Sequence, residues 1–236
     1  MTQHLLYQKF IILIIYLRLS MPSKNIIKTI FSLLEKKHHL TMLEELKDYT
    51  PFQKLVATLL SARTKDSTTI PIVKKLFQDC PTPEKILNLD LKVLEKRLYS
   101  IGFYKNKANH VQKLSKLVVE KYQGKVPENF DELVSLPGVG RKTANCLLNY
   151  AFHQPAIAVD THVHRIANRL EWVKTTKPEE TEFQLKKIIP KELWVKVNSL
   201  LVGHGQTICS PINPKCSICP ILKYCPFGKQ RMEKKS

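Results

Sequence analysis

Four cysteines near the C-terminus are the most distinctive residues in this chain of 236 residues that could do chemistry. They follow the spacing C-x6-C-x2-C-x5-C, at Cys209, Cys216, Cys219 and Cys225. Four thiolates this close in sequence can surround one metal centre. Structural zinc sites usually combine two close pairs, whereas here only Cys216 and Cys219 form one. The uneven spacing favours an iron–sulfur cluster, with zinc or free cysteines as the alternatives.

A glycine-containing turn before a lysine is a second candidate for chemistry. Residues 136–144 read L-P-G-V-G-R-K-T-A, which is typical of a helix, a tight turn and a second helix. Two glycines in three residues let the backbone approach a ligand closely, and exposed N–H groups at a helix start bind phosphate oxygens. An ordinary interhelical turn is the alternative to a helix-hairpin-helix that grips a DNA backbone without reading bases. The residues expected to form this grip are Gly138, Val139, Gly140, Arg141 and Thr143.

Lys142 lies in the first turn of the second of these helices, at the positive end of its dipole. That position disfavours the ammonium form, and partial burial would disfavour it further, so we expect a lowered pKa for Lys142. A lysine with a lowered pKa can act as a nucleophile and form a Schiff base. A further phosphate-contacting lysine is the alternative.

Asp160 is a third candidate, because it precedes a predicted helix over residues 161–172 and can cap it. A carboxylate at a helix start stays ionised, since the dipole and the amide donors both favour its charge. It could stabilise positive charge on a sugar or orient a nucleophile, and capping is compatible with either role. His162 and His164 do not share a helix face, so we expect no metal pair there. A packed or solvent-facing role is expected for each.

Composition indicates a polyanionic partner. Thirty-eight Lys and Arg against 20 Asp and Glu give a net charge of +18. Such a surplus creates a positive field that attracts phosphates, and nucleic acid fits it better than a membrane surface. A hydrophobic content of 43% in a chain of this length can bury a core, so a disulfide framework is not expected.

The first residues do not fit the rest of the chain. Residues 10–17 read F-I-I-L-I-I-Y-L, an apolar run flanked by Lys9 and Arg18 and followed by Met21. The run is too short to span a bilayer. We expect residues 1–22 to be an over-extended start or a disordered tail, with a membrane-associating segment as the alternative.

Elsewhere the apolar period is helical. Apolar residues recur at three and four residues over 26–34, and Thr50-Pro51 predicts the start of a helix that runs to Leu60. Two short helices are expected after Pro83. Further helices are expected over residues 66–77, 105–122, 128–134, 142–152, 161–172, 179–188 and 192–202. Only A-I-A-V at 156–159 looks strand-like, with no obvious partner, so the sequence predicts an all-α protein.

Together, the hairpin run, the run I-A-V-D-T-H-V-H-R and the cysteine spacing resemble the endonuclease III family of DNA glycosylases. The resemblance preserves the order of these motifs and covers about residues 25–227, including L-L-S-A-R-T-K-D at 59–66 and I-G-F-Y-K-N-K-A at 101–108. It implies a [4Fe-4S] cluster on the four cysteines. It also implies two all-α lobes that flank a DNA cleft: a six-helix barrel with the hairpin, residues 44–154, and a cluster lobe, residues 155–236, with a helix from 23–43 packed on it.

By this resemblance, Lys142 is the nucleophile and Asp160 the essential aspartate. Arg63 stands where the family usually has glutamine, at a position expected to fill the gap left by a flipped base. Phe103 stands where the family often has a leucine wedge, with core packing beside Tyr104 as its alternative. His162 is also expected near the DNA. Lys215 and Lys223, on the cluster loops, are expected to contact phosphates, and the basic residues after them either extend this surface or form a solvated tail.

The implied function is a bifunctional glycosylase and abasic-site lyase that removes oxidised pyrimidines from duplex DNA. A monofunctional mismatch glycosylase is one alternative, although Lys142 counts against it, because such relatives carry a different residue there. A non-catalytic DNA-binding module is another, and only Lys142 and Asp160 speak against it. We expect an intracellular monomer in the cytoplasm or nucleoid, without membrane association. No motif ranks the lesions.

Overall fold

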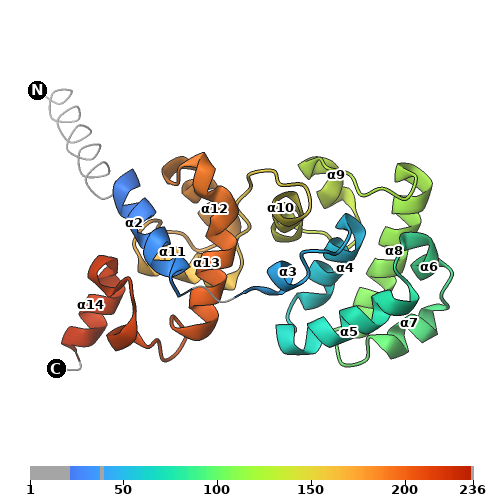
Figure 1. Cartoon of the computed structure of the whole chain (residues 1–236), viewed down its shortest axis with the longest axis horizontal. Helices are drawn as coiled ribbons and strands as arrows, with labels where there is room; N and C mark the ends of the chain where they lie inside the picture. The colour runs from blue at the N-terminus through green and yellow to red at the C-terminus, as the bar shows by residue number, and fades with distance from the viewer. Residues whose placement is uncertain (1–21, 38–39, 235–236) are drawn as a thin grey trace, which may run out of the picture.

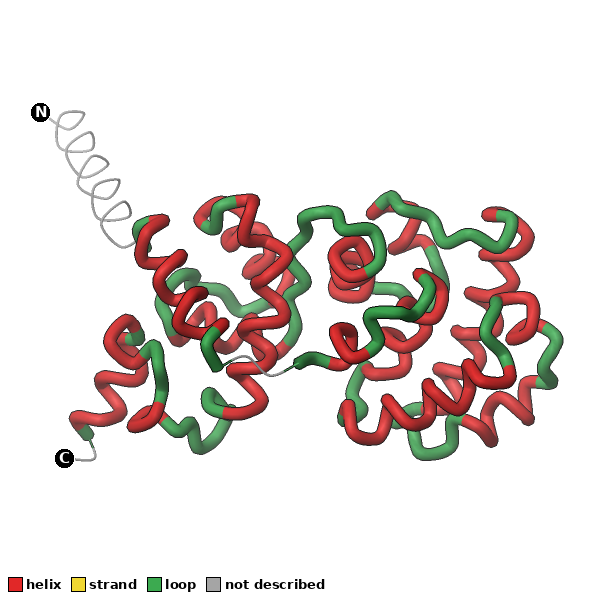
Figure 2. The backbone as a smooth tube through the Cα atoms, in the orientation of Figure 1, coloured by secondary structure: helices red, strands yellow, loops and turns green. Residues whose placement is uncertain are grey.

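The computed structural model describes residues 22–37 and 40–234, and within these residues it contains helices and no strand (Figures 1 and 2). Two lobes lie end to end along the long axis. The barrel lobe comprises α3 (Met42–Glu45), α4 (Pro51–Ser61), α5 (Asp66–Asp79), α6 (Pro83–Leu87), α7 (Leu91–Arg97), α8 (Tyr104–Tyr122), α9 (Phe130–Ser135) and α10 (Arg141–Tyr150). The cysteine lobe comprises α2 (Lys24–Glu35), α11 (Thr161–Arg169), α12 (Pro178–Ile188), η1 (Lys191–Leu193), α13 (Trp194–Thr207), η2 (Cys216–Ile218), η3 (Leu222–Tyr224) and α14 (Pro226–Glu233).

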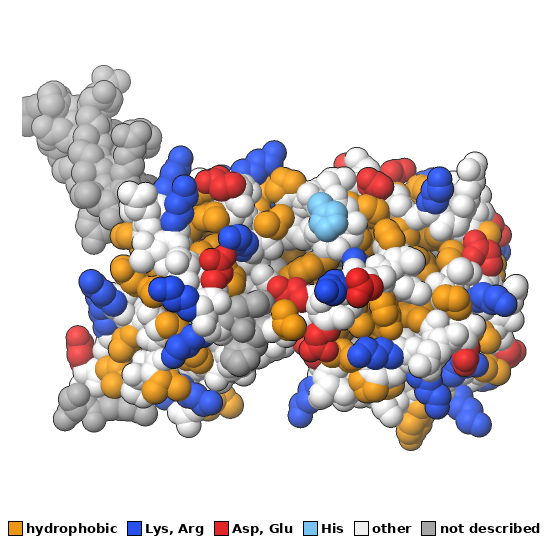
Figure 3. Space-filling view, viewed as in Figure 1, with side chains coloured by type: hydrophobic (Ala, Val, Ile, Leu, Met, Phe, Trp, Pro, Cys, Tyr) orange, Lys and Arg blue, Asp and Glu red, His pale blue; other side chains and the backbone are white. Residues whose placement is uncertain are grey.

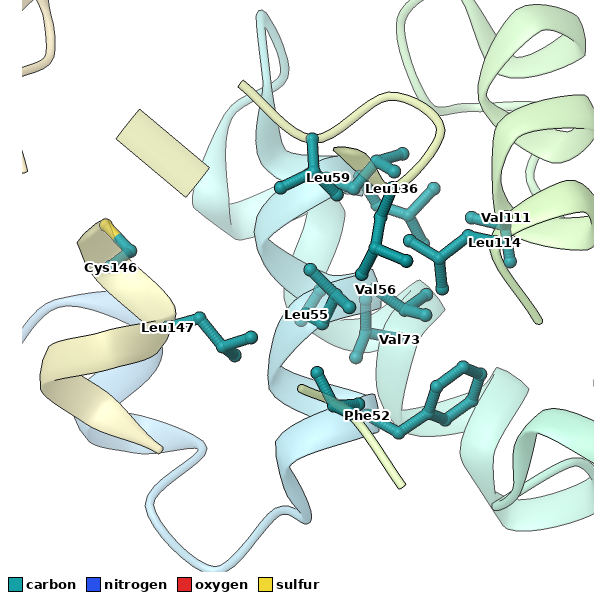
Figure 4. Close-up of a cluster of buried hydrophobic side chains, with 14 of the residues drawn as sticks. Phe52, Leu55, Val56, Leu59, Val73, Val111, Leu114, Leu136, Cys146 and Leu147 are labelled. Atoms are coloured by element: carbon teal, nitrogen blue, oxygen red, sulfur yellow. The ribbon is translucent and has the colours of Figure 1, made fainter. Parts of the chain in front are cut away.

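Each lobe has a hydrophobic core of its own. In the barrel lobe, Leu55 and Val56 of α4 meet Val111 and Leu114 of α8, and all four are fully buried (Figure 4). In the cysteine lobe, Ile27, Ile30, Phe31 and Leu34 of α2 join side chains from α11 to α13. Burial of such apolar side chains is the main favourable term in folding each lobe.

Residues 156–159 connect the two cores. Ala156 and Ala158 are buried in the core of the barrel lobe, whereas Ile157 and Val159 are buried in that of the cysteine lobe. Successive side chains of an extended segment point to opposite sides, so one stretch of backbone serves both lobes. The strand-like alternation in the sequence therefore reflects this double burial and not a sheet.

The predicted helices are present, and the structure adds several. Thr50 caps α4 as expected, because its side chain accepts a hydrogen bond from the Gln53 amide. α3 and the C-terminal α14 were not predicted, and they are only 4 and 8 residues long. α14 places much of the basic tail on a helix. The boundaries of independent domains at 43/44 and 154/155 stay predictions.

The apolar run at 10–17 and most of the expected N-terminal extension lie outside the described residues. Across the part of the chain that is described, no helix has both the length and the apolar character that a membrane span needs. Lys and Arg side chains are scattered over both lobes on the face shown in Figure 3, interspersed with acidic and apolar ones.

Candidate active site between the lobes

A cavity of about 880 Å³ lies between the lobes and brings the two predicted catalytic residues together. Lys142 and Thr143 of α10 line it from the barrel lobe, and Asp160 and His162 line it from the cysteine lobe. Arg63, in the loop after α4, lines the same cavity. An open cavity lined by a lysine from one lobe and a carboxylate from the other can hold one substrate group beside both.

The turn before α10 uses its two glycines differently. Gly138 has a φ of +78°, and a Cβ placed there would come within 2.9 Å of the His110 ring. Gly140 is the N-cap of α10, with a φ of −95° and open space around its missing Cβ. Only Gly138 therefore requires glycine for its backbone conformation. The N-cap lacks a side chain, so the first amides of α10 have no side-chain acceptor there and can receive an anion.

The pKa of Lys142 is raised, and the predicted lowering was wrong. Burial lowers this pKa, as expected, but Cys146, Asp160 and Asp66 raise it by more. Cys146 lies one helical turn further along α10 and is fully buried. The sequence argument included the dipole and burial but not these neighbours, two of which come from other elements. The ammonium form is therefore favoured in the free protein, and a proton must leave before Lys142 can attack.

Asp160 is fixed by the backbone of its own helix. It is the N-cap of α11, and its Oδ1 accepts hydrogen bonds from the amides of His162 and Val163 at 2.8 and 2.9 Å. The predicted cap is confirmed. These two bonds set the direction of the carboxylate, which lines the cavity that Lys142 also lines.

The two histidines have different surroundings. His162 lines the cavity, and its ring packs so closely on Gly205 of α13 that a Cβ there would meet it at 2.6 Å. Its Nδ1 lies 3.1 Å from Nη2 of Arg165. His164 points elsewhere, and its Nδ1 is 2.7 Å from the Thr181 hydroxyl of α12. Both residues are half-buried, and of the two only His162 lines the cavity.

Arg63 and Phe103 lie next to one another at the edge of the barrel lobe. Both have left-handed backbones, with φ of +53° and +60°, and the guanidinium carbon of Arg63 is 5.7 Å from the centre of the Phe103 ring. Phe103 is 62% exposed, which argues against the alternative of core packing. The buried Lys107 supports the loop, since its Nζ donates to the carbonyls of Leu60 and Ala62. Burial lowers the pKa of Lys107 to about 8.

The other predicted hairpin residues point away from the cavity. Val139 is buried in the core of the barrel lobe, and its amide already donates to the Leu136 carbonyl at 3.1 Å. The Arg141 guanidinium binds Glu182 of α12, on the cysteine lobe. Glu182 was not predicted as a functional residue, and its only sequence signal is its position three residues after Glu179.

Lys215 and Lys223 lie in the segment that carries the cysteines, and both are exposed.

The four cysteines line one enclosed cavity, together with Arg169 of α11 and His204 of α13. Hydrogen bonds reach three of the sulfurs, from Arg169 Nη1 to Cys209 Sγ at 3.1 Å, from the Gly228 amide to Cys225 Sγ at 3.3 Å and between His204 Nε2 and Cys219 Sγ at 3.7 Å. Within residues 22–37 and 40–234, no three His, Cys, Asp or Glu side chains are close enough to hold one metal ion. A single zinc needs its sulfurs about 2.3 Å away. The four cysteines therefore line one cavity, and thiolates are ligands that suit either zinc or an iron–sulfur cluster.

Comparison with known proteins identifies the family. Residues 56–191 match the model of the HhH-GPD superfamily of base excision DNA repair proteins. The endonuclease III of Thermotoga maritima is 46% identical over 185 residues, which cover 78% of this chain and 87% of that protein. The chain belongs to the endonuclease III family. The predicted resemblance is therefore confirmed.

Two solved structures of endonuclease III with DNA share the fold of this family member. A trapped covalent intermediate matches it with a TM-score of 0.81 and 39% identity, over 90% of this chain and 100% of that one. A non-covalent complex matches with a TM-score of 0.82 and 40% identity, over the same shares. The predicted all-α, two-lobed architecture of the endonuclease III family is confirmed.

Proposed function

We propose that this protein is a bifunctional DNA glycosylase and abasic-site lyase that removes oxidised pyrimidines from duplex DNA. The observation that supports this most is the cavity lined by Lys142 from one lobe and Asp160 from the other. A nucleophilic amine and a carboxylate on opposite walls suit an attack at a sugar carbon with developing positive charge. Membership of a family whose solved structures include a covalent DNA intermediate supports the same reading.

The chemistry begins when a damaged nucleotide is flipped out of the duplex into the cavity. Lys142 must first lose its proton to solvent, which leaves the Asp160 carboxylate ionised. The amine then forms a bond to C1′ while the glycosidic bond breaks and the base leaves with the electron pair. Asp160 stabilises the positive charge on the sugar. The sugar ring then opens: the C1′–O4′ bond breaks, O4′ takes a proton, and an iminium is left between Lys142 and C1′. The iminium acidifies the 2′ proton, and its loss expels the 3′ phosphate and cuts the strand.

The hairpin and the edge of the barrel lobe would hold the DNA. The backbone amides of Gly138 and Gly140 and those at the start of α10 are suited to one phosphate. Phe103 is apolar, exposed and next to Arg63, as expected of a wedge that enters the stack while a long polar side chain fills the gap. Lys215 and Lys223 would add a second phosphate contact. We further propose that the protein acts inside the cell and binds duplex DNA as a monomer.

The four cysteines would hold a [4Fe-4S] cluster, which supplies a rigid cross-link for the loops of the cysteine lobe when bound. The hydrogen bonds from Arg169 and from the Gly228 amide to two of the sulfurs are of the kind that favours thiolate ligands. Equal contents of iron and acid-labile sulfide in protein purified without oxygen would support the cluster. Protein that is folded, active and loaded with zinc alone would contradict it.

The test of the chemistry is borohydride trapping on a duplex that carries one abasic site. We expect a covalent protein–DNA band with the wild type and none with Lys142→Ala. Base release from a thymine glycol duplex, measured beside a duplex with a thymine mismatch, separates the bifunctional enzyme from a mismatch glycosylase. Active-site occupancy is checked by binding to the same duplex. Cluster-loaded wild type that binds but yields no band would refute the lyase assignment.

A further inference from the structure

Arg141 reaches from the barrel lobe to the cysteine lobe. Its Nε and Nη2 donate to the two carboxylate oxygens of Glu182 on α12, at 3.1 and 2.9 Å. A two-point pair of this kind fixes direction as well as distance. The Glu182 side chain is only 3% exposed, so solvent ions screen the pair little.

An aromatic ring from each lobe lies against the same guanidinium. Its central carbon is 4.7 Å from the centre of the Phe130 ring on α9 and 5.0 Å from that of Phe183 on α12. Both distances are within the range of cation–π attraction. Burial alone would raise the pKa of Glu182, but the hydrogen bonds from Arg141 and Lys186 outweigh it and lower this pKa. Glu182 is therefore ionised at neutral pH, and the contact is a charged one.

Few other side chains cross between the lobes. The helix pairs that pack most extensively, such as α6 with α8 and α11 with α13, each belong to one lobe. Other polar links between the lobes include the attraction between Lys142 and Asp160. They also include single hydrogen bonds from Gln206 to Asp66 at 3.2 Å, from Tyr150 to Asn198 at 3.5 Å and from Asn198 to the Ala158 carbonyl at 3.0 Å. The contact of Arg141 differs from these links, because it combines a two-point ion pair with two ring contacts.

We propose that Arg141 is a positioning residue that locks the lobes at the closure in which Lys142 and Asp160 face one nucleotide, and that it is not a phosphate ligand. Lys142 follows Arg141 directly in the chain, so the lock acts at the start of the helix that carries the amine. On the other side, α12 packs against α11, which Asp160 caps. The Arg141 side chain thus links the helix that carries Lys142 to the pair of helices that positions Asp160. The catalytic role of this closure rests on the proposed function.

The experiment compares Arg141→Ala, Glu182→Gln and the double variant with the wild type, in single-turnover trapping at saturating abasic DNA. We expect each single variant to slow trapping by roughly 10- to 100-fold, because small misplacements of reacting groups have effects of this size. The double variant should be no slower than the slower single one, since both remove one contact. DNA affinity and its salt dependence should stay unchanged. Lys186→Met, which removes a second partner of Glu182 within the cysteine lobe, should trap at nearly the wild-type rate.

A phosphate role for Arg141 predicts a different pattern. Arg141→Ala would then weaken DNA binding and reduce the slope of log affinity against log salt by about one, while Glu182→Gln would leave both unchanged. That pattern, or normal trapping by folded single variants, would overturn the proposal. If Arg141→Ala does not fold, Arg141→Lys, which keeps the charge but loses the two-point geometry, replaces it and should also slow trapping.

The lock can also be tested without activity. Small-angle X-ray scattering of Arg141→Ala should show a larger radius of gyration than the wild type, because the lobes are then less firmly held. Wild type that forms no covalent band would refute the proposed function, and the scattering comparison would still decide on the lock. Equal radii for folded wild type and variant would refute the lock alone.

Discussion

The starts of α10 and α11 face the same cavity from opposite lobes, yet their first turns are built in opposite ways. α11 begins with Asp160, whose carboxylate accepts two amide hydrogen bonds and lies at the positive end of the helix dipole. α10 begins with Gly140, which offers no side-chain acceptor, and continues with Arg141 and Lys142. Cations in the first turn oppose the dipole.

The start of α11 therefore contributes to both stability and chemistry, whereas the start of α10 contributes to chemistry alone. At α11, the charge that caps the helix is also the charge needed beside a cationic sugar. At α10, the amides are left open for a phosphate, and the lysine is held there by attraction to Asp160 and Asp66. Variants at the two starts should therefore change activity and stability in different combinations.

Lys142→Gln should have the largest effect, the complete loss of the covalent band, because no amine remains to attack. Its unfolding free energy should change by less than about 1 kcal/mol, since relief at the helix start opposes the lost attraction to the two aspartates. Borohydride trapping and urea unfolding measure the two quantities. A large loss of stability would mean that Lys142 is structural, and the contrast between the helix starts would fail.

Asp160→Ala should lower both quantities, the trapping rate by on the order of 10²–10⁴-fold and the unfolding free energy by about 0.5–2 kcal/mol. Asp160→Ser is the matched control, because serine caps a helix well but carries no charge. It should recover most of the stability and little of the activity. Recovery of both would show that only the cap matters.

Gly138→Ala should destabilise the fold by about 1–2 kcal/mol, because alanine is strained at a φ of +78° and its Cβ would contact the His110 ring. Gly140→Ala should cost less, since its φ of −95° suits any residue and nothing lies within 4 Å of the added carbon. Thermal unfolding of the two variants provides the comparison. Equal losses would show that the turn does not depend on the left-handed position.

Cys146→Val should have the smallest effect, a shift of the pH profile of trapping to lower pH by less than about one unit. Trapping needs the neutral amine, so its rate rises with pH, and a raised pKa moves that rise to higher pH. Cys146 is one of the groups that raise the pKa of Lys142, and valine removes its sulfur at similar volume. Cys80→Val, in the same core but not among the groups that shift the pKa of Lys142, should leave the profile in place. A shift to higher pH would contradict the sign.

The sequence was sufficient for what depends on local pattern. Most helices followed from apolar period and capping residues, and the cap at Asp160 followed from its place before Thr161. Short elements were missed, because α3 and α14 are held by tertiary contacts and a few turns of helix carry little periodic signal. The four cysteines were found by spacing, although the cavity that they share could only be seen in the fold.

What the sequence could not supply was the set of neighbours from distant segments. The lowered pKa expected for Lys142 was wrong because Asp66 and Asp160 approach it from other elements. The DNA contact predicted for Arg141 stays a prediction, but its ion pair with Glu182, 41 residues away, could not be predicted from the sequence. Lys107, too, donates a hydrogen bond to Leu60 at the end of α4, 47 residues away in the chain. Residues that meet from such distant positions follow no spacing pattern that a single sequence would show.

The segment 156–159 makes the chain sensitive to the parity of length changes at this point. Because its side chains alternate between two cores, inserting or deleting one residue would turn Ile157 and Val159 toward the wrong lobe and expose the alanine positions to the other. A change of two residues would keep each side chain facing its own core. Homologous chains should therefore differ in length here by even numbers, or carry a compensating bulge.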